Sequence, residues 1–393
     1  MTPTSSPLSA RMAGLLPGLL AREGAGLVDQ VAGLAIPDPE PSPQAIVADL
    51  AGCGLLTHCV PKLSEAGEAG ALPIGRLCLL RAALAYRSPL YDLMFVMQGL
   101  GSHAVAQAGT PEQRRAYLPQ VAAGTALAAL GLTEPEAGSD LAGIATRARK
   151  QADGSYRIDG EKVFISNAGL ATHYVLYART DDHPKRGLSA FLLPAATPGL
   201  HTSPLRLLCD DHPIGRLTLS GVVLPAEARI GPEGAGMSLA FATLARFRPT
   251  VGAAAVGMAA RALDEAIAHV RRRTQFGQPL ASFQATQLRI AEMATELQAA
   301  ALLVQHAAER LDAAQAGGHE PDGSESAMAK LFATEVSQRV VDGALQLHGG
   351  SGLLAGSVIE RLYRDVRALR IYEGTSEIQK LIIARSLLRE PGR

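Results

Sequence analysis

Hydrophobic positions recur at two different spacings along the chain, and the spacing changes twice. Residues 1 to about 128 are rich in Ala and Leu, with Gly and Pro between the apolar stretches, which predicts helices. From about 129 to 234 apolar and polar residues alternate, as they do in half-buried strands. Helical spacing then returns. The pattern predicts a mainly α chain with an N-terminal helical domain over 1–128, a middle β domain over 129–234 and a C-terminal helical bundle over 235–393.

The C-terminal part contains the clearest helical pattern. Apolar residues there recur at steps of three and four and make one continuous stripe, formed by Ile290, Met293, Leu297, Ala300, Val304, Ala307 and Leu311. Further helical segments are expected near 251–272, 325–347 and 375–389, with residues 317–323 as an exposed connection. Four long amphipathic segments predict a four-helix bundle.

The middle region has local signals for strands and turns. Residues 156–165 alternate around Asp159-Gly160, a pair that favours a two-residue hairpin turn. Further strands are expected over 173–178, 188–193 and 217–224. Before this region, Thr110 followed by Pro111 predicts the start of a helix, because Thr caps the first turn and Pro fits its first position.

Composition narrows the class of protein. A chain of 393 residues allows two or three domains, and 47% hydrophobic residues suffice for sizeable cores. Lys plus Arg (37) balance Asp plus Glu (37), which argues against a nucleic-acid partner. The cysteines, at positions 53, 59, 78 and 209, show neither metal-ligand spacing nor a disulfide framework. We therefore expect no metal site and reduced cysteines in a cytoplasmic protein.

Targeting and membrane segments are not expected. Residues 1–22 lack acidic residues and contain Ser and two Arg, as transit peptides do, but Pro3, Pro7 and Pro17 interrupt any continuous amphipathic helix. No apolar run approaches the roughly 20 residues that a membrane-spanning helix needs.

One carboxylate occupies a conspicuous place near the C-terminus. The segment 371–379 reads Ile-Tyr-Glu-Gly-Thr-Ser-Glu-Ile-Gln and places Glu373 in a Gly turn just before a helix. Gly374 frees the backbone there, and Thr375 or Ser376 can cap the helix. A carboxylate in this position either complements the helix dipole or is held for proton abstraction.

Four further motifs precede this one. They are Leu-Thr-Glu-Pro-Glu-Ala-Gly-Ser-Asp at 132–140, Gly-Glu-Lys-Val-Phe-Ile-Ser-Asn-Ala at 160–168, Arg-Thr-Gln-Phe-Gly-Gln-Pro at 273–279 and Gln-Leu-His-Gly-Gly at 346–350. In this order, from about residue 51 to about residue 388, the chain resembles the acyl-CoA dehydrogenase family of flavoproteins.

The resemblance implies a fold and an assembly. The fold has a helical N-terminal domain, a small β-barrel or sandwich domain and a four-helix bundle. Family members form homotetramers, or homodimers in some cases. FAD lies between the β domain and the bundle and reaches a neighbouring subunit, and an electron-transferring flavoprotein accepts the electrons.

The resemblance also implies a reaction. Glu373 removes the α proton of an acyl-CoA thioester while a hydride leaves the β carbon for the flavin, which yields the trans-2-enoyl-CoA. Some relatives place the base on a bundle helix, at a position that matches Phe247 here. Phenylalanine cannot abstract a proton, so Glu373 is the expected base. The neighbouring Arg248 matches an Arg near the substrate in the family.

Site residues follow from the resemblance. Phe164 stands where many relatives have Trp, a residue that this chain lacks. Arg273 belongs to a basic run that is also typical of a solvated helix end. The implied substrate-binding residues are Ser139, Arg248 and Gly374. The implied FAD-binding residues are Leu132, Thr133, Ser139, Phe164, Ser166, Arg273, Phe276, Gln284, Gln346, Gly349, Gly350, Thr375 and Glu377.

Several alternatives stay open. The chain can instead be a flavin oxidase, a dehydrogenase of acyl-carrier-protein thioesters, or a non-catalytic flavin-binding member of the family. His348 is expected to be structural, and residues 99–104 are not a dinucleotide loop because no strand precedes them. A buried Arg87 would bind the second carboxylate of a dicarboxylyl-CoA. We expect a surface position for Arg87 instead.

Overall fold

The computed structural model describes residues 6–184, 186–209, 212–318 and 323–389. The chain forms two compact units. The helical unit contains residues 1–38, 73–92 and 245–393, and the sheet unit contains residues 39–72 and 93–244. The three-domain boundaries expected from the sequence stay a prediction.

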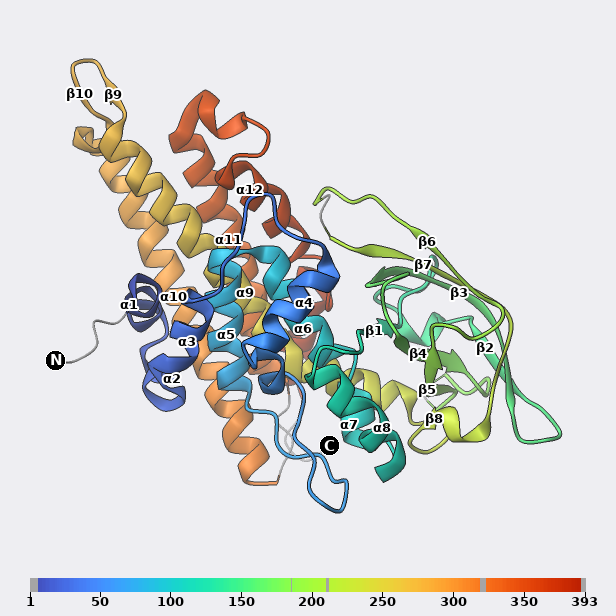
Figure 1. The fold of residues 1–393 in the computed structure, drawn as a ribbon. Helices are drawn as coiled ribbons and strands as arrows, with labels where there is room; N and C mark the ends of the chain where they lie inside the picture. The colour runs from blue at the N-terminus through green and yellow to red at the C-terminus, as the bar shows by residue number, and fades with distance from the viewer. Residues whose placement is uncertain (1–5, 185, 210–211, 319–322, 390–393) are drawn as a thin grey trace. The chain divides into compact units, whose positions relative to one another are not determined.

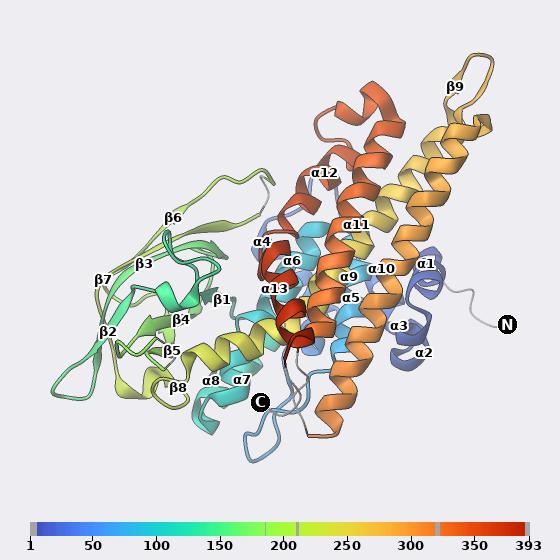
Figure 2. The same ribbon diagram turned by 180° about the vertical axis from the view of Figure 1, so that it is seen from behind.

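Long helices build the helical unit (Figures 1 and 2). They are α9 (Gly236–Arg272), whose first nine residues belong to the sheet unit, α10 (Gln284–Ala316) and α11 (Ser324–His348), with α5 (Ile74–Arg87), α12 (Val358–Ala368) and α13 (Ser376–Leu387) beside them. The predicted helical segments are confirmed. The apolar stripe of α10 is buried from Met293 to Leu311, and Ile290 is half-buried. Residues 319–322 of the predicted connection lie outside the described residues.

Small residues let these helices approach closely. A Cβ added to Gly257 of α9 would lie 2.2 Å from the carbonyl oxygen of Ala82 in α5, and one added to Gly252 would lie 2.9 Å from Val304 in α10. Both positions therefore require Gly. This close packing sets α5 directly against the middle of α9, where the candidate site lies.

The N-terminal segment of the chain is also helical. It forms α1 (Pro7–Leu15), α2 (Pro17–Glu23) and α3 (Ala25–Ala32). Pro7 and Pro17 each occupy the first turn of a helix, where the missing N–H has no cost. Leu8, Met12 and Leu19 are buried, so residues 7–32 are part of the helical unit.

The sheet unit contains one eight-stranded sheet and several helices. The helices are α4 (Pro43–Gly52), α6 (Pro89–Leu100), which begins in the helical unit, α7 (His103–Ala108) and α8 (Pro111–Ala122). The strands are β1 (Ala128–Gly131), β2 (Arg147–Lys150), β3 (Tyr156–Ser166), β4 (His173–Arg179), β5 (Leu188–Pro194), β6 (Leu200–Pro204), β7 (Ile214–Leu224) and β8 (Arg229–Ile230).

The order β6-β7-β3-β2-β4-β5-β8, with β1 beside β4, confirms a central β domain. The described pairings do not close it into a barrel. The three strands predicted over 173–178, 188–193 and 217–224 are confirmed.

Local capping behaves as the sequence predicts at α8. The Thr110 hydroxyl accepts a hydrogen bond from the Gln113 N–H (3.2 Å), and the Thr110 N–H donates to the Gln113 side chain (2.9 Å). These two bonds form a capping box, which satisfies two backbone N–H groups that a helix start would leave free.

The hairpin predicted at Asp159-Gly160 is wrong. Both residues lie inside β3, where the register against β7 shifts between Ile158 and Gly160. The Asp159 carboxylate accepts a hydrogen bond from the Gly221 N–H (2.7 Å). A Cβ on Gly160 would lie 2.5 Å from the Thr146 hydroxyl. Gly160 is therefore needed for a β-bulge and a close approach between strands, not for a turn.

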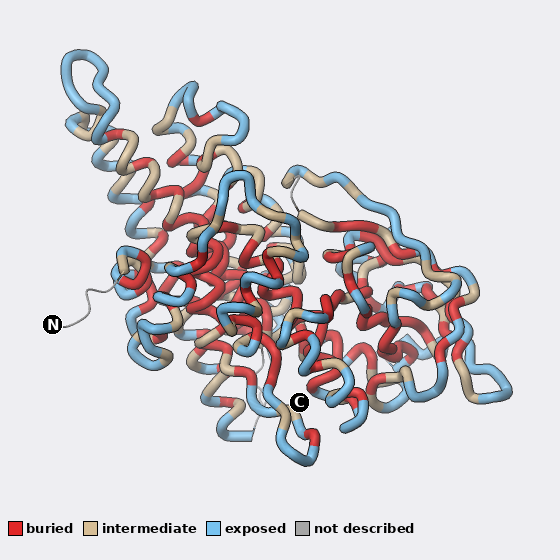
Figure 3. Tube along the Cα trace, viewed as in Figure 1, coloured by how far each residue is buried: buried red, intermediate tan, exposed pale blue. Residues whose placement is uncertain are grey.

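A hairpin that the sequence pattern did not predict connects α9 to α10. Its strands are β9 (Thr274–Gln275) and β10 (Gln278–Pro279), and both turn residues, Phe276 (φ 52°) and Gly277 (φ 78°), are left-handed. Figure 3 shows it as an exposed extension of the helical unit. No helix in the described part of the chain is long and apolar enough to span a membrane.

Candidate active site

Glu373 lies in a strained turn between α12 and α13. Its φ is 54° and that of Gly374 is 90°, so two consecutive residues are left-handed. This conformation is easy for Gly but unfavourable for Glu, and such strain concentrates at functional sites. Thr375 caps α13 as predicted, because its hydroxyl accepts a hydrogen bond from the Ile378 N–H (3.4 Å). Ser376 instead donates to the Glu335 carboxylate (2.6 Å).

Glu373 is half-buried, and one oxygen of its carboxylate is shielded from water. Its Oε2 atom is buried and accepts no hydrogen bond from any described residue. Burial raises the pKa of Glu373, and the positive charges of Arg81, Lys330 and Arg248 oppose this rise without cancelling it. A desolvated carboxylate with a raised pKa is a better proton acceptor than the same group in water.

Two of these cations lie on the long helices of the unit. Arg248 of α9 is buried, and its Nε atom donates to no described residue. Burial lowers the pKa of Arg248, while the charge of Glu373 acts in the opposite direction. Lys330 of α11 is fully buried and donates to the Gly374 carbonyl (2.8 Å), and burial lowers its pKa to about 8.

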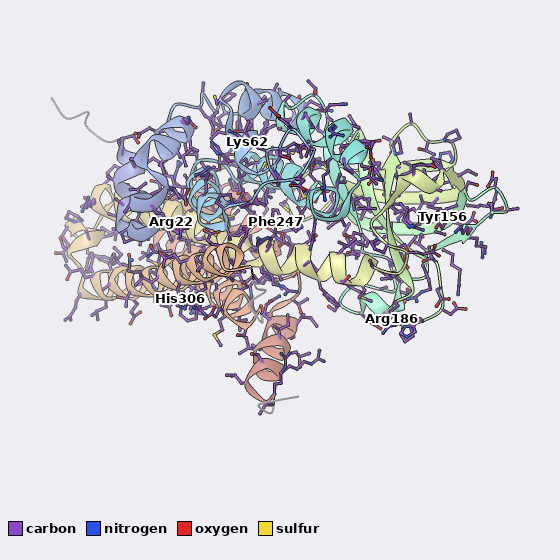
Figure 4. All side chains as sticks on the ribbon, turned by 90° about the horizontal axis from the view of Figure 1, so that it is seen from below. Arg22, Lys62, Tyr156, Arg186, Phe247 and His306 are labelled. Atoms are coloured by element: carbon purple, nitrogen blue, oxygen red, sulfur yellow. The ribbon has the colours of Figure 1, made fainter. Side chains whose placement is uncertain are left out.

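The third cation is part of a buried ion pair. Arg81 of α5 donates from Nε and Nη2 to the two carboxylate oxygens of Asp92 in α6 (2.8 and 2.7 Å). Its Nη1 atom donates to the Thr250 hydroxyl of α9 (2.9 Å), which in turn donates to the carbonyl of Phe247 (2.7 Å; Phe247 is labelled in Figure 4). Burial lowers the pKa of Arg81, but the charge of Asp92 outweighs it, so the guanidinium stays charged.

In the sheet unit, two of the predicted segments lie side by side. The Val163 N–H donates to the Thr133 carbonyl (2.9 Å). The buried Lys162 ammonium joins Leu132 to Glu134, since it donates to the Leu132 carbonyl (3.1 Å) and to the Glu134 carboxylate (2.8 Å). These contacts hold 132–134 against 162–164.

Phe164 and Ser166 follow on the same strand. Phe164 is left-handed (φ 57°), and 57% of its surface is exposed. An exposed aromatic ring on a strained backbone suits it for stacking on a planar ligand. Ser166 shares a hydrogen bond with the His212 ring (2.9 Å), and burial lowers the pKa of His212 to about 4. Ser139 lies apart from these residues in sequence and is exposed.

The other predicted FAD residues divide into two groups within the helical unit. Arg273, Phe276 and Gln284 are exposed at the α9–α10 hairpin, whereas Gln346, Gly349 and Gly350 are exposed at the end of α11. His269 and His348 stack with ring centroids 4.4 Å apart, which brings the two groups to the same end of the unit. His348 also contacts the Ala344 carbonyl (2.8 Å), in line with a structural role.

Glu373 is remote from that end. Lys330, which contacts Gly374, lies on α11 18 residues before His348, about 27 Å along the helix. Thr375 and Glu377 lie next to Glu373 at the start of α13. Within one chain the structure therefore separates the Arg273 and Gly349 groups from the residues around the carboxylate.

Arg87 does not have the surface position that the sequence suggested. The two hydrogens of one of its nitrogens, Nη1, are shared among the carbonyls of Val31 (2.6 Å), Ala32 (2.9 Å) and Leu34 (2.8 Å). Arg87 is half-buried and ties the end of α3 to α5. These three bonds give the guanidinium a structural role.

Known proteins match the chain over most of its length. Residues 33–125, 129–222 and 234–388 match the family models for the N-terminal, middle and C-terminal domains of acyl-CoA dehydrogenase. A probable acyl-CoA dehydrogenase of Bacillus subtilis, YngJ, is 41% identical over 294 residues, which cover 74% of this chain and 76% of the relative. The chain belongs to the acyl-CoA dehydrogenase family.

Solved structures agree with this assignment. Butyryl-CoA dehydrogenase from Megasphaera elsdenii superposes with a TM-score of 0.82 at 28% identity, covering 99% of this chain and 100% of that one. A chain of the electron transferring flavoprotein structure of Acidaminococcus fermentans gives a TM-score of 0.84 at 29% identity, with the same coverage. The predicted family and its FAD-dependent oxidoreductase activity are thereby confirmed.

The residues of this acyl-CoA dehydrogenase fit FAD, the cofactor of the family. The exposed Phe164 ring lies next to the backbone of Val163, which is paired with Thr133. Apart from neighbours in the chain, no atom of the described residues lies within 4 Å of where a Cβ would stand on Gly349 or Gly350, so ligand atoms can approach that backbone closely. Arg273 supplies a positive charge suited to a pyrophosphate at the same end of the helical unit.

Some residues around the base were missed by the sequence patterns. Lys330, Arg81 and Gln379 were not singled out, although each is a polar residue that the fold buries completely or almost completely. The sequence contains a signal for Arg81 and Lys330. Arg81 interrupts the apolar run 77–85, and Lys330 interrupts the small and apolar residues of 327–333. A single charge inside an apolar helix face is a candidate for a buried functional contact.

We expect Glu373→Gln to stabilise the FAD-saturated enzyme at alkaline pH. The folded-state pKa of Glu373 lies above its ordinary value of 4.5, so its contribution to stability is full below pH 4.5 and is lost as pH rises through the folded pKa. Glutamine avoids this loss. Thermal unfolding should give a midpoint about 1–2 °C above wild type at pH 8 and no difference near pH 4.

The control for this measurement is Glu296→Gln, which removes a surface carboxylate paired with Arg339 (3.2 Å). It should give no gain at pH 8, because a surface ion pair is worth at most about 1 kcal/mol and its loss does not stabilise. A midpoint for Glu373→Gln at or below that of wild type at pH 8 would contradict the burial argument.

We expect Arg87→Ala to lower stability without changing substrate preference. The carbonyls of Val31, Ala32 and Leu34 lose their donor, which should reduce the free energy of unfolding by about 1–3 kcal/mol. Urea unfolding measures this loss. The ratio of glutaryl-CoA to butyryl-CoA turnover should equal that of wild type, and a selective loss of glutaryl-CoA turnover would show that Arg87 binds substrate.

Proposed function

We propose that the enzyme converts an acyl-CoA thioester to the trans-2-enoyl-CoA, with Glu373 as the base. The observation that carries this proposal is a buried carboxylate oxygen of Glu373 without a hydrogen-bond partner among the described residues, in a group whose charge interacts with three cations. The α proton passes to Glu373, and the β carbon loses a hydride as the C=C bond forms. FAD, when bound, accepts that hydride.

The surroundings of Glu373 suit both halves of a proton transfer. Burial favours the protonated acid that forms in the reaction, whereas Arg248, Lys330 and Arg81 favour the carboxylate that must be present beforehand. Burial is the larger of the two effects, so the pKa of Glu373 is raised towards the working pH, while the cations limit the rise. The Glu373 N–H donates to no described residue and is available for the thioester oxygen, where negative charge develops.

We further propose binding roles for the exposed residues. Leu132, Thr133, Phe164 and Ser166 bind the flavin ring, Thr375 and Glu377 lie along the dinucleotide, and Ser139, Arg248 and Gly374 contact the substrate. Arg273, Phe276, Gln284, Gln346, Gly349 and Gly350 bind the FAD of a partner subunit. The separation of about 27 Å along α11 supports the last assignment, and with it a homotetramer or homodimer.

Two further proposals concern the electron acceptor and the cellular location of the enzyme. An electron-transferring flavoprotein is the proposed electron acceptor, supported by the similarity to a chain in such a structure. The proposed site of action is the cytoplasm. Cys53, Cys59 and Cys78 form no disulfide, which supports a reducing compartment.

Glu373→Gln should retain FAD and bind acyl-CoA but lose flavin reduction. The amide keeps the shape of the side chain and cannot accept the α proton, so anaerobic bleaching of the flavin should slow about a thousandfold or more. Stopped-flow absorbance with butyryl-CoA gives this rate, and Glu296→Gln serves as the control. Bleaching at near the wild-type rate would assign the base to another residue.

A carboxylate at position 247 should restore part of the activity. Phe247 lies on α9 next to Arg248, and its backbone is connected to Arg81 through Thr250. The double variant Phe247→Glu/Glu373→Gln should therefore bleach about tenfold faster than Glu373→Gln alone. No recovery in a folded, FAD-loaded double variant would show that position 247 does not reach the α carbon.

A further inference from the structure

One backbone carbonyl next to the proposed base receives two buried donors. The Gly374 carbonyl accepts hydrogen bonds from the Lys330 ammonium of α11 (2.8 Å) and from the Gln379 amide of α13 (2.8 Å). The same amide nitrogen lies 3.3 Å from the Glu373 carbonyl. Both donor residues are fully buried. We call this arrangement of Lys330 and Gln379 on Gly374 the carbonyl clamp.

The clamp acts on the strained part of the backbone. A left-handed backbone is unfavourable for Glu373 and persists only where surrounding contacts enforce it. Gly374 is required as well, because its φ is 90° and a Cβ would lie 2.7 Å from the Gln379 amide nitrogen. Lys330 and Gln379 hold the Gly374–Thr375 peptide, and Gln379 also contacts the Glu373 carbonyl, so together they restrict the turn from which the carboxylate leaves the chain.

Burying the Lys330 ammonium is unfavourable if its only role is to form one structural hydrogen bond. Its ammonium is buried, and no carboxylate in the described part of the chain lies within ion-pair distance of it. Its charge interacts most strongly with Glu373, and also with Arg248, Glu335 and Glu377. A buried ammonium without an ion pair destabilises a fold. The position of Lys330 next to the turn that carries Glu373 therefore indicates a role in the reaction.

We propose that Lys330 and Gln379 are positioning residues for Glu373. Through the Gly374 carbonyl they hold the turn so that the carboxylate points at the α carbon of the bound thioester, and Lys330 adds a positive charge that favours the ionised base. This inference rests on the proposed function of Glu373. Neither residue touches the reacting atoms.

Lys330 is charged and Gln379 is neutral. Removing one or the other should therefore affect the pH dependence of the reaction differently. The charges that act on Glu373 are Arg81 of α5, Arg248 of α9, Lys330 of α11 and the negative Asp92 of α6. Removing Lys330 leaves one cation fewer, so the pH at which the base ionises should rise. Gln379 is neutral, so its removal should disturb geometry without moving the ionisation.

Lys330→Met, Lys330→Arg and Gln379→Met test the clamp, since Met keeps side-chain length without a donor and Arg keeps charge and donors. The matched control is Thr334→Val. Thr334 is buried on α11 one turn after Lys330, and its hydroxyl donates to the Lys330 backbone carbonyl (2.9 Å). This variant loses a buried hydrogen bond but leaves the clamp intact.

The measurements are the rate of anaerobic flavin reduction by butyryl-CoA from pH 4.5 to 9, the dissociation constant for acyl-CoA, and the thermal midpoint. Lys330→Met and Gln379→Met should each slow reduction about 10- to 100-fold, with acyl-CoA affinity within about twofold of wild type, as for a misplaced catalytic group. The rising limb of the pH profile should move up by about 1 unit in Lys330→Met only. Lys330→Arg should recover most of the rate, and Thr334→Val should reduce flavin at the wild-type rate.

Equal losses in Thr334→Val and Lys330→Met, or a Lys330→Met pH profile that matches wild type, would overturn the proposal. If Lys330→Met does not fold, Gln379→Met is the deciding variant. Flavin reduction at the wild-type rate in Gln379→Met would refute the proposed role of the clamp. Failure of the proposed function of Glu373 can be distinguished from failure of the clamp. In that case Glu373→Gln itself would reduce flavin normally, whereas failure of the clamp alone leaves Glu373→Gln inactive.

Discussion

The burial of one carboxylate is the constraint on which the rest of this site depends. Glu373 is left-handed at the start of α13, and one of its oxygens is cut off from water. An isolated buried anion is strongly unfavourable. Cations from three different helices, Arg81, Arg248 and Lys330, reduce this penalty without removing it, so the pKa stays raised. The helical unit thus maintains a carboxylate that gains stability when it takes up a proton.

Close packing between the helices of the helical unit holds the cations near this carboxylate in place. Small residues in α9 let α5 and α10 approach it closely, as the contacts of Gly257 and Gly252 show. The ion pair of Arg81 with Asp92 and the bond from Arg81 to Thr250 then join α5, α6 and α9. Arg81, Asp92 and Thr250 are paired with one another, which makes this part rigid, whereas one Glu373 oxygen and the Arg248 Nε atom have no hydrogen-bond partner among the described residues.

Local signals in the sequence were reliable where local forces decide the structure. The stripe along α10 and the caps Thr110 and Thr375 depend on neighbours within a few residues, and they were predictable. Asp159-Gly160 was misread because Thr146 and Gly221, distant in sequence, turn it into a bulge. The bonds of Lys330 to Gly374 and of Arg81 to Thr250 span 44 and 169 residues, so no local pattern contains them. The base itself was recognisable only through its family motif.

The most direct test of this account is an infrared titration of the Glu373 carboxyl group. The difference between wild-type and Glu373→Gln spectra isolates the C=O stretch of the protonated acid as pH is varied. The account predicts one carboxyl group whose titration midpoint lies above the ordinary Glu value of 4.5 and which is missing from the variant. A midpoint at or below 4.5 would show that the surrounding cations outweigh burial, and would contradict the claim that Glu373 is held ready to accept a proton.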